Sequence, residues 1–302
     1  MHTVMKWPAS LVLSAALGGS ALAGAAPQKG GPAKPRTRQV FVNVTGQNGA
    51  PVLDLGAGDF EVTESGTKRE IGRAALATAP MRIALIVDTS DGAAAALNHV
   101  RAGLLAFIDA VPPEHEIMIV STGRQTRVRV PPTTDRKKAR DSAGGLFSDG
   151  GATVLGDTLL EMDDRFMRKA EDRWPVFVII TGDGAEGSAG ANEKKMNDWI
   201  TALPSKGYSA HGFVLKYRGG GQPEVIASHV VQAAGGRYDF MNTSNSLPEK
   251  LKELGEHLAA STKQMASWYR VEFATTGPEN APVDIGVARA GVAVKLSYRR
   301  QP

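Results

Sequence analysis

The fold is decided by one stretch of sequence, Met81-Arg82-Ile83-Ala84-Leu85-Ile86-Val87, and by the polar turn that follows it, Asp88-Thr89-Ser90-Asp91-Gly92. The apolar run has almost no polar alternation, which is typical of a strand buried on both faces of a parallel sheet. The turn is rich in carboxylates and hydroxyls and lies at the carboxyl end of this strand. Open α/β sheets bind ligands along that edge, so the turn is the first candidate for a functional site.

Two further segments bring polar groups to the same edge. The apolar run 176–180 ends in Thr181-Gly182-Asp183-Gly184, and residues 150–157 form a glycine-rich loop that carries Thr153 and runs into a predicted helix. Carboxylates and hydroxyls on three such loops suit a hard cation such as Mg2+. As an alternative, Asp88 caps the helix that follows it. Asp157 is interpreted as a first-turn residue, where the helix dipole favours negative charge.

Strands and helices alternate through residues 80–265, which predicts a doubly wound, mostly parallel α/β sheet. The predicted helices cover residues 97–111, 135–143, 155–167, 192–203, 223–234 and 247–258. The further predicted strands cover residues 116–121, 126–130 (an edge strand), 208–215 and 237–240. The order Ser246-Leu247-Pro248-Glu249 predicts a capping box at the start of the last helix.

Both ends of the chain have apolar residues at every second position. Residues 39–75 contain such strands at 40–45 and 60–64, with an Asn48-Gly49 turn between them. Residues 266–302 contain three more runs of this kind. Because a few N-terminal strands cannot stand alone, we expect the two ends to pair in one small antiparallel β domain, with the α/β domain (residues 80–265) inserted between them.

The three edge segments resemble the metal-ion-dependent adhesion site of von Willebrand factor A (VWA) domains. That pattern is Asp-x-Ser-x-Ser, then a Thr in a glycine-rich loop, then an Asp after a buried strand. Asp88, Ser90, Thr153 and Asp183 match it, while Gly92 stands where the second Ser is expected and offers no hydroxyl. The resemblance implies a VWA fold and a divalent cation, Mg2+ or else Mn2+ or Ca2+, that accepts a carboxylate from a protein partner.

The rest of the chain resembles the VWA-related proteins described from Acidobacteria. The resemblance rests on residues 44–52 and 59–66, on the strand into Asp88, and on the closing strand 269–273 with its Tyr-x-Val-x-Phe pattern. It covers nearly all of the mature chain and implies an architecture rather than an activity.

The first residues have the pattern of a secretory signal peptide. A short basic start precedes the apolar or small residues 11–22, and Ala21-Leu22-Ala23 fits a cleavage site before Gly24. This apolar core is too short and too interrupted for a membrane-spanning helix. We therefore predict a signal peptide at 1–23, a flexible linker at 24–38, and an exported protein, periplasmic or secreted, without a transmembrane segment after signal removal.

The composition excludes several classes of function. The 302 residues contain no cysteine, which excludes disulfides, cysteine–zinc sites and thiol catalysis. The formal net charge is +4, but five Lys and Arg residues lie within residues 1–38, so residues 39–302 carry −1. The chain after residue 38 is therefore near neutral, and nucleic acid is not an expected partner.

A non-enzymatic binding protein is the function that the sequence favours. The chain has no Gly-x-Ser-x-Gly elbow and no His-Glu-x-x-His helix. By resemblance, Asp88, Ser90, Thr153 and Asp183 hold a cation whose free position takes an acidic side chain of a protein ligand. One alternative is a metal-free envelope scaffold or interaction protein with a degenerate metal site. A further alternative is a metal-dependent hydrolase built on Asp88 and Asp183.

Overall fold

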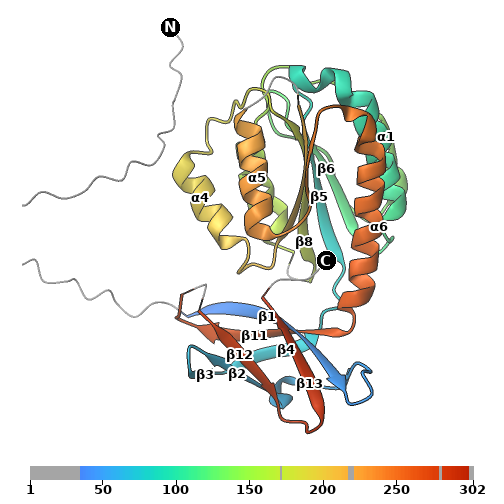
Figure 1. Cartoon of the computed structure of the whole chain (residues 1–302). Coiled ribbons are helices and arrows are strands. Elements are labelled where there is room, and N and C mark those ends of the chain that lie inside the picture. Colours follow the sequence, from blue (N-terminus) through green and yellow to red (C-terminus); the bar gives the residue numbers. More distant parts are fainter. Residues whose placement is uncertain (1–34, 171, 217–220, 279–280, 299–302) are drawn as a thin grey trace, which may run out of the picture. The chain divides into compact units, whose positions relative to one another are not determined.

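The computed structural model describes residues 35–170, 172–216, 221–278 and 281–298 (Figure 1). A six-stranded sheet has the order β10-β9-β8-β5-β6-β7. The two central strands, β5 (Met81–Val87) and β8 (Trp174–Gly182), pair in parallel with Val87 opposite Ile180. Every residue of β8 and all of β5 except Arg82 are buried. The uninterrupted apolar runs are therefore strands covered on both faces, as predicted.

The other strands extend this sheet on both sides. Three of them run parallel to their inner neighbours: β6 (Glu116–Ser121), β9 (Ser209–Leu215) and β10 (Tyr238–Met241). The fourth, β7 (Arg127–Thr133), is an antiparallel edge strand beside β6. The predicted α/β fold with a mostly parallel, doubly wound sheet is confirmed.

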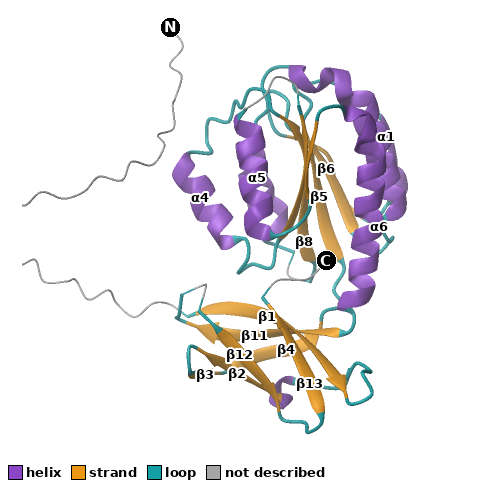
Figure 2. Cartoon of the chain, viewed as in Figure 1, coloured by secondary structure: helices purple, strands orange, loops and turns teal. Residues whose placement is uncertain are grey.

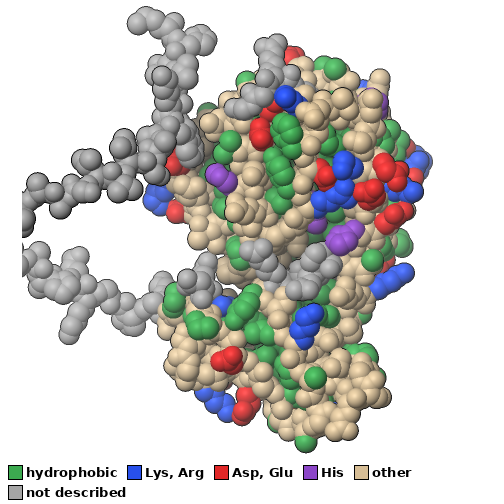
Figure 3. Space-filling view, in the orientation of Figure 1, with side chains coloured by type: hydrophobic (Ala, Val, Ile, Leu, Met, Phe, Trp, Pro, Cys, Tyr) green, Lys and Arg blue, Asp and Glu red, His purple; other side chains and the backbone are tan. Residues whose placement is uncertain are grey.

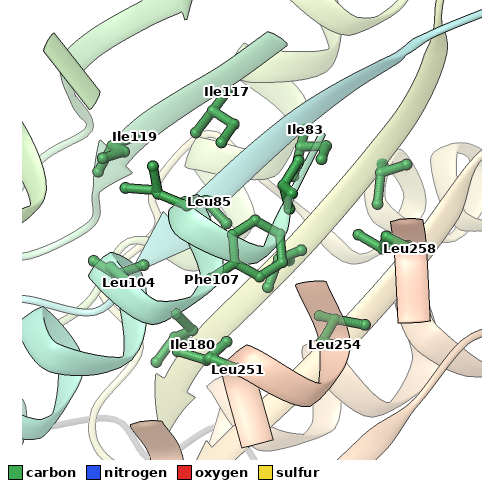
Figure 4. Packing of buried hydrophobic residues seen from close by; sticks show 14 of the residues in the cluster. Ile83, Leu85, Leu104, Phe107, Ile117, Ile119, Ile180, Leu251, Leu254 and Leu258 are labelled. Carbon is green, nitrogen blue, oxygen red and sulfur yellow. The ribbon is translucent and has the colours of Figure 1, made fainter. Parts of the chain in front are cut away.

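Helices cover both faces of this sheet (Figure 2). The first face packs against α1 (Leu97–Ala110), α2 (Arg136–Gly144) and α6 (Leu247–Met265). The second face packs against α3 (Leu155–Met162), α4 (Glu193–Ala202) and α5 (Gln222–Ala234). Figure 4 shows the first core, in which Leu85 and Ile119 of the sheet lie near Leu104 and Phe107 of α1. Burying one such side chain contributes about 1.5–3 kcal/mol.

Glycines allow α1 and α6 to approach closely. A Cβ atom on Gly103 would lie 2.7 Å from Cδ1 of Leu251, and one on Gly255 would lie 2.8 Å from Cβ of Ala110. Such distances are shorter than packed carbon atoms adopt, so a larger residue at either position would push the helices apart.

Strands from both ends of the chain form two antiparallel sheets. The orders are β13-β1-β11-β4 and β12-β2-β3. Their strands are β1 (Arg36–Gly46), β2 (Phe60–Glu64), β3 (Thr67–Arg69), β4 (Ile71–Leu76), β11 (Trp268–Thr275), β12 (Val283–Val287) and β13 (Val292–Ser297). One apolar core joins residues of both ends, among them Val42, Val62 and Val271. The expected pairing of the two ends is thus present in the structure.

The first strand begins earlier than predicted and is buried on both faces. It begins at Arg36, which pairs with Thr275, so residues 36–38 belong to β1 rather than to a linker. Phe41 alternates with the buried Val40 and Val42, yet its ring is buried too, and its centroid lies 5.2 Å from that of Trp174. The strand is therefore covered on both faces at this point. The predicted signal peptide and residues 24–34 of the predicted linker lie outside the described residues.

The predicted capping box at the start of α6 is wrong. Ser246 has φ −83° and ψ −7°, which is a helical conformation, and its side chain makes no capping hydrogen bond. The hydroxyl instead donates to Sδ of Met241 at 3.6 Å. A 3-10 turn over residues 244–246 precedes α6, so the backbone is already helical where the box needs an extended residue.

Two further observations concern the described helices and the surface visible in Figure 3. In the described part of the chain, no helix has the length and apolar character that crossing a membrane requires. On the face shown in Figure 3, Lys and Arg side chains lie close to Asp and Glu side chains.

Candidate functional site

The loops after β5 and β8 leave the sheet at its carboxyl edge. The backbone N–H of Asp88 donates to the carbonyl of Ile180 at 2.8 Å, and that of Asp183 donates to the carbonyl of Leu215 at 3.1 Å. Asp88 and Asp183 are 4% and 3% exposed. The structure therefore places both predicted carboxylates, buried, at the ends of adjacent strands.

The glycine-rich loop joins the same edge. The backbone N–H of Thr153 donates to the carbonyl of Ala185, two residues after Asp183, at 3.1 Å. The Thr153 hydroxyl lies 2.5 Å from the hydroxyl of Thr122, which follows β6. Gly150 and Gly151 have φ of +74° and +68°, a left-handed conformation that glycine adopts readily. Two consecutive glycines thus let the loop turn sharply and bring Thr153 to the edge.

The Asp88 carboxylate is surrounded by uncharged donors. The Ser90 backbone N–H donates to Oδ1 at 2.8 Å, and the Ser90 hydroxyl and the Gly182 backbone N–H are further donors. Burial raises the pKa of Asp88, and these hydrogen bonds offset that effect only in part. No described Lys, Arg or His forms an ion pair with Asp88. A bound cation would compensate this buried charge.

Asp88 does not cap the helix that follows. The 3-10 helix at Asp91–Ala96 has Ser90 as its N-cap residue, without a side-chain capping bond. Asp88 accepts from the N–H of Ser90 itself, one residue before this helix begins. The capping alternative is therefore not supported, and the carboxylate stays at the edge of the sheet.

The set Asp88, Ser90, Thr153 and Asp183 suits a hard divalent cation, since it offers two carboxylates and two hydroxyls, all from buried residues. Gly92 is exposed and contributes no side-chain oxygen. Among the described residues, no group of three or more His, Cys, Asp and Glu side chains is placed to hold a metal. A cation at this edge would therefore depend on the hydroxyls and on water as well as on the two carboxylates.

Asp149 supports the Asp88 loop, although no sequence motif points to it. Its Oδ2 atom accepts hydrogen bonds from the hydroxyls of Thr89 at 2.7 Å and Ser121 at 2.9 Å, and pairs with the Arg129 guanidinium. The side chain is 1% exposed. Burial raises the pKa of Asp149, but the hydrogen bonds from Arg129, Thr89 and Ser121 outweigh it and hold the pKa below its ordinary value. An acid directly before Gly150 was the available signal.

Three more carboxylates at this edge bind backbone N–H groups. Asp91 accepts from the N–H of Gly151 at 2.9 Å. Asp157 lies in the first turn of α3, as predicted, and accepts from the N–H groups of residues 189–191. Glu186 accepts from the first N–H of α3 at 3.2 Å, and burial raises its pKa. These acids fix the loops around the candidate cation site.

The fold and the edge together define a class: a doubly wound α/β domain with a buried site of carboxylates and hydroxyls at the carboxyl ends of its strands. Residues 83–186 match the family model of the von Willebrand factor type A domain. This part of the chain is therefore a VWA domain, and the predicted family is confirmed. No curated protein matches the chain.

One solved structure shares the fold at low sequence identity, and two others are similar with lower TM-scores. A von Willebrand factor type A protein from Catenulispora acidiphila matches with a TM-score of 0.50 and 18% identity over 73% of this chain and 50% of that one. The conserved hypothetical protein BatB from Bacteroides thetaiotaomicron matches with a TM-score of 0.47 and 15% identity, over 62% of this chain and 98% of that one. Proximal thread matrix protein 1 from the mussel byssus, with a zinc-occupied MIDAS motif, matches with a TM-score of 0.47 and 13% identity, over 68% of this chain and 50% of that one. This chain thus spans about half the length of the first structure, and the likeness concerns the fold alone.

Proposed function

We propose that the chain is an exported, non-enzymatic interaction module that binds a protein partner through a divalent cation. Asp88, Ser90, Thr153 and Asp183 would hold the cation, which is Mg2+, Mn2+ or Ca2+. When bound, the cation supplies a position for an acidic side chain of the partner. The observation that carries the proposal is the buried Asp88 carboxylate, which has only uncharged donors around it.

The rest of the edge acts by positioning these groups. Ser90 orients the Asp88 carboxylate through its backbone N–H. Asp149 holds Thr89, between the two first ligands, and Asp91 holds the glycine-rich loop at Gly151. Loops fixed in this way need little reordering when a partner binds, which preserves affinity.

Gly92 sets the strength expected of the site. Because it offers no hydroxyl, water would take that position, and we expect affinity in the micromolar-to-millimolar range found for weaker oxygen-ligand sites, roughly 10⁻⁶ to 10⁻³ M. The same missing ligand motivates the second candidate, a metal-free envelope scaffold that uses these loops or the antiparallel sheets. A hydrolase would also need a general base that activates water. We give that role to none of the residues at this edge, so the hydrolase is the weakest alternative.

Isothermal titration calorimetry of Mg2+, Mn2+ and Ca2+ into the purified chain tests the proposal. We expect binding that disappears in Asp88→Ala and persists in Asp284→Ala, which removes an exposed carboxylate from β12. Far-ultraviolet circular dichroism controls for folding of both variants. If the wild type binds no cation, the site does not work as proposed and the metal-free scaffold takes its place.

A further inference from the structure

Phe147 is an exposed aromatic residue beside the candidate cation site. It is 51% exposed, whereas the preceding Leu146 is 2% exposed. The next two residues both contact the carbonyl of Thr89, from the Ser148 hydroxyl at 3.2 Å and from the Asp149 N–H at 2.8 Å. Two residues span at most about 7 Å, so the Phe147 backbone lies close to the loop of Asp88 and Ser90.

The Phe147 ring is held in place although it faces solvent. The Arg129 guanidinium carbon lies 4.5 Å from the ring centroid, a distance typical of cation–π contact. Arg129 in turn donates to the Ser121 hydroxyl at 2.8 Å and pairs with Asp149. A rigid, exposed aromatic side chain offers a large contact area at a small cost in conformational entropy, as binding hot spots do.

Arg124 lies against the glycine-rich loop. Its backbone N–H donates to the carbonyl of Ala152 at 2.8 Å, and a Cβ atom on Gly151 would lie 3.3 Å from its own Cβ. Its backbone φ of +59° is a left-handed conformation that residues other than glycine rarely adopt, and such backbone strain is found at functional sites. The side chain is exposed and forms no ion pair with any described residue.

We infer that Phe147 and Arg124 determine which partner the edge recognises. The partner is an acidic peptide segment with three features. One acidic residue meets the cation, an apolar residue lies next to it in the partner's sequence, and a second acidic residue lies close by. The apolar side chain packs on the Phe147 ring, and the second carboxylate binds the Arg124 guanidinium, which matches carboxylate geometry in a two-point contact. Of the neighbouring exposed residues, Gly92, Ala94 and Ala95 carry no charge, and the exposed Asp91 carboxylate already accepts a hydrogen bond from the backbone N–H of Gly151 at 2.9 Å.

This inference rests on the proposed function, and one selection experiment separates the two. A library of short random peptides is selected on the immobilised full chain in the presence of Mn2+, and single enriched peptides are then measured by fluorescence polarisation. We expect sequences with Asp or Glu next to Phe, Leu or Ile and a second acid nearby. Their binding should be lost with EDTA and in Asp88→Ala.

Variants at the two flanking positions give the decisive comparison. In Phe147→Ser the apolar preference should vanish and binding should weaken about tenfold, as expected for loss of a hot-spot aromatic. In Arg124→Gln the preference for a second acid should vanish. The controls Phe240→Ser and Arg73→Gln remove an exposed ring from β10 and an exposed charge from β4. They should change neither the apolar preference nor the preference for a second acid.

The outcomes fall into distinct groups. Cation-dependent peptides with an acid but no apolar preference, bound equally by Phe147→Ser and Arg124→Gln, would overturn the inference and leave the proposed function standing. Peptides that bind equally well with EDTA and to Asp88→Ala would overturn the proposed function. Failure to enrich any peptide would overturn the inference, provided that thermal unfolding shows a folded protein.

Discussion

Asp149→Asn is the substitution that best tests how the edge is built. Asparagine keeps the shape of the side chain, and its carbonyl oxygen still accepts from the Thr89 and Ser121 hydroxyls. The change removes the negative charge that pairs with Arg129, whose side chain is only 16% exposed. Breaking a buried ion pair from one side costs about 3–5 kcal/mol. Because Arg129 retains partial access to water, we expect a loss of about 3 kcal/mol in the free energy of unfolding.

Urea denaturation followed by tryptophan fluorescence measures this loss, since Trp174 and Trp199 are buried in the two cores of the α/β sheet. With a denaturant slope of about 2 kcal/mol per molar urea, the midpoint should fall by about 1.5 M. Asp284→Asn, at an exposed position of β12, is the matched control and should change stability by less than about 0.5 kcal/mol. A loss below about 1 kcal/mol in Asp149→Asn would refute the view that the ion pair organises this edge.

The pH dependence gives a second check on the same variant. The folded-state pKa of Asp149 is depressed below its ordinary value of 3.8. Its stabilising contribution is therefore present above pH 3.8 and is lost as the pH falls through the folded-state pKa. The variant lacks this contribution, so the stability difference between wild type and Asp149→Asn should narrow in acid. A difference that stays constant from neutral pH down to about pH 3 would contradict the assignment.

Three further substitutions test separate features. Gly92→Ser adds a hydroxyl at a position without a left-handed backbone, and calorimetry should show cation binding about tenfold tighter; an unchanged Kd would mean that position 92 does not face the cation. Gly103→Ala forces Leu251 aside and should cost about 1–2 kcal/mol in thermal unfolding, whereas no loss would show that α1 and α6 separate freely. Tyr269→Phe leaves the Leu55 N–H without its 3.0 Å acceptor and should cost about 1–3 kcal/mol, with a neutral result implying that water replaces the hydroxyl.

The central sheet and the placement of its edge were predictable because they depend on short, continuous patterns. The runs before Asp88 and Asp183 are apolar without interruption, and parallel strands bring their carboxyl ends to one edge wherever they stand in the sequence. The pairing of the chain's two ends followed from their shared alternation and from the instability of a few isolated strands.

Features that depend on three-dimensional neighbours were not predictable in this way. Asp149 gains its role from Thr89, Ser121 and Arg129, which come from three separate segments, and its sequence position shows only an acid before two glycines. Phe41 is buried because another element covers the second face of β1, which alternation along one strand cannot reveal. The helical backbone of Ser246 likewise depends on the turn before it and overrides a local capping pattern.

The pairing of β1 with β11 also has a consequence during synthesis. Arg36 pairs with Thr275, and the strand Val40–Val44 has its partners only after the whole α/β domain has been made. At about 5–20 residues per second, a ribosome takes roughly 10 to 50 s to pass from the end of β1 to the end of β11. During that interval an alternating apolar strand has both edges free, the condition that promotes pairing with other chains. Until its own C-terminal strands have been made, β1 therefore lacks both strands that it pairs with in its sheet, and this interval is when the nascent chain is most open to pairing with other chains.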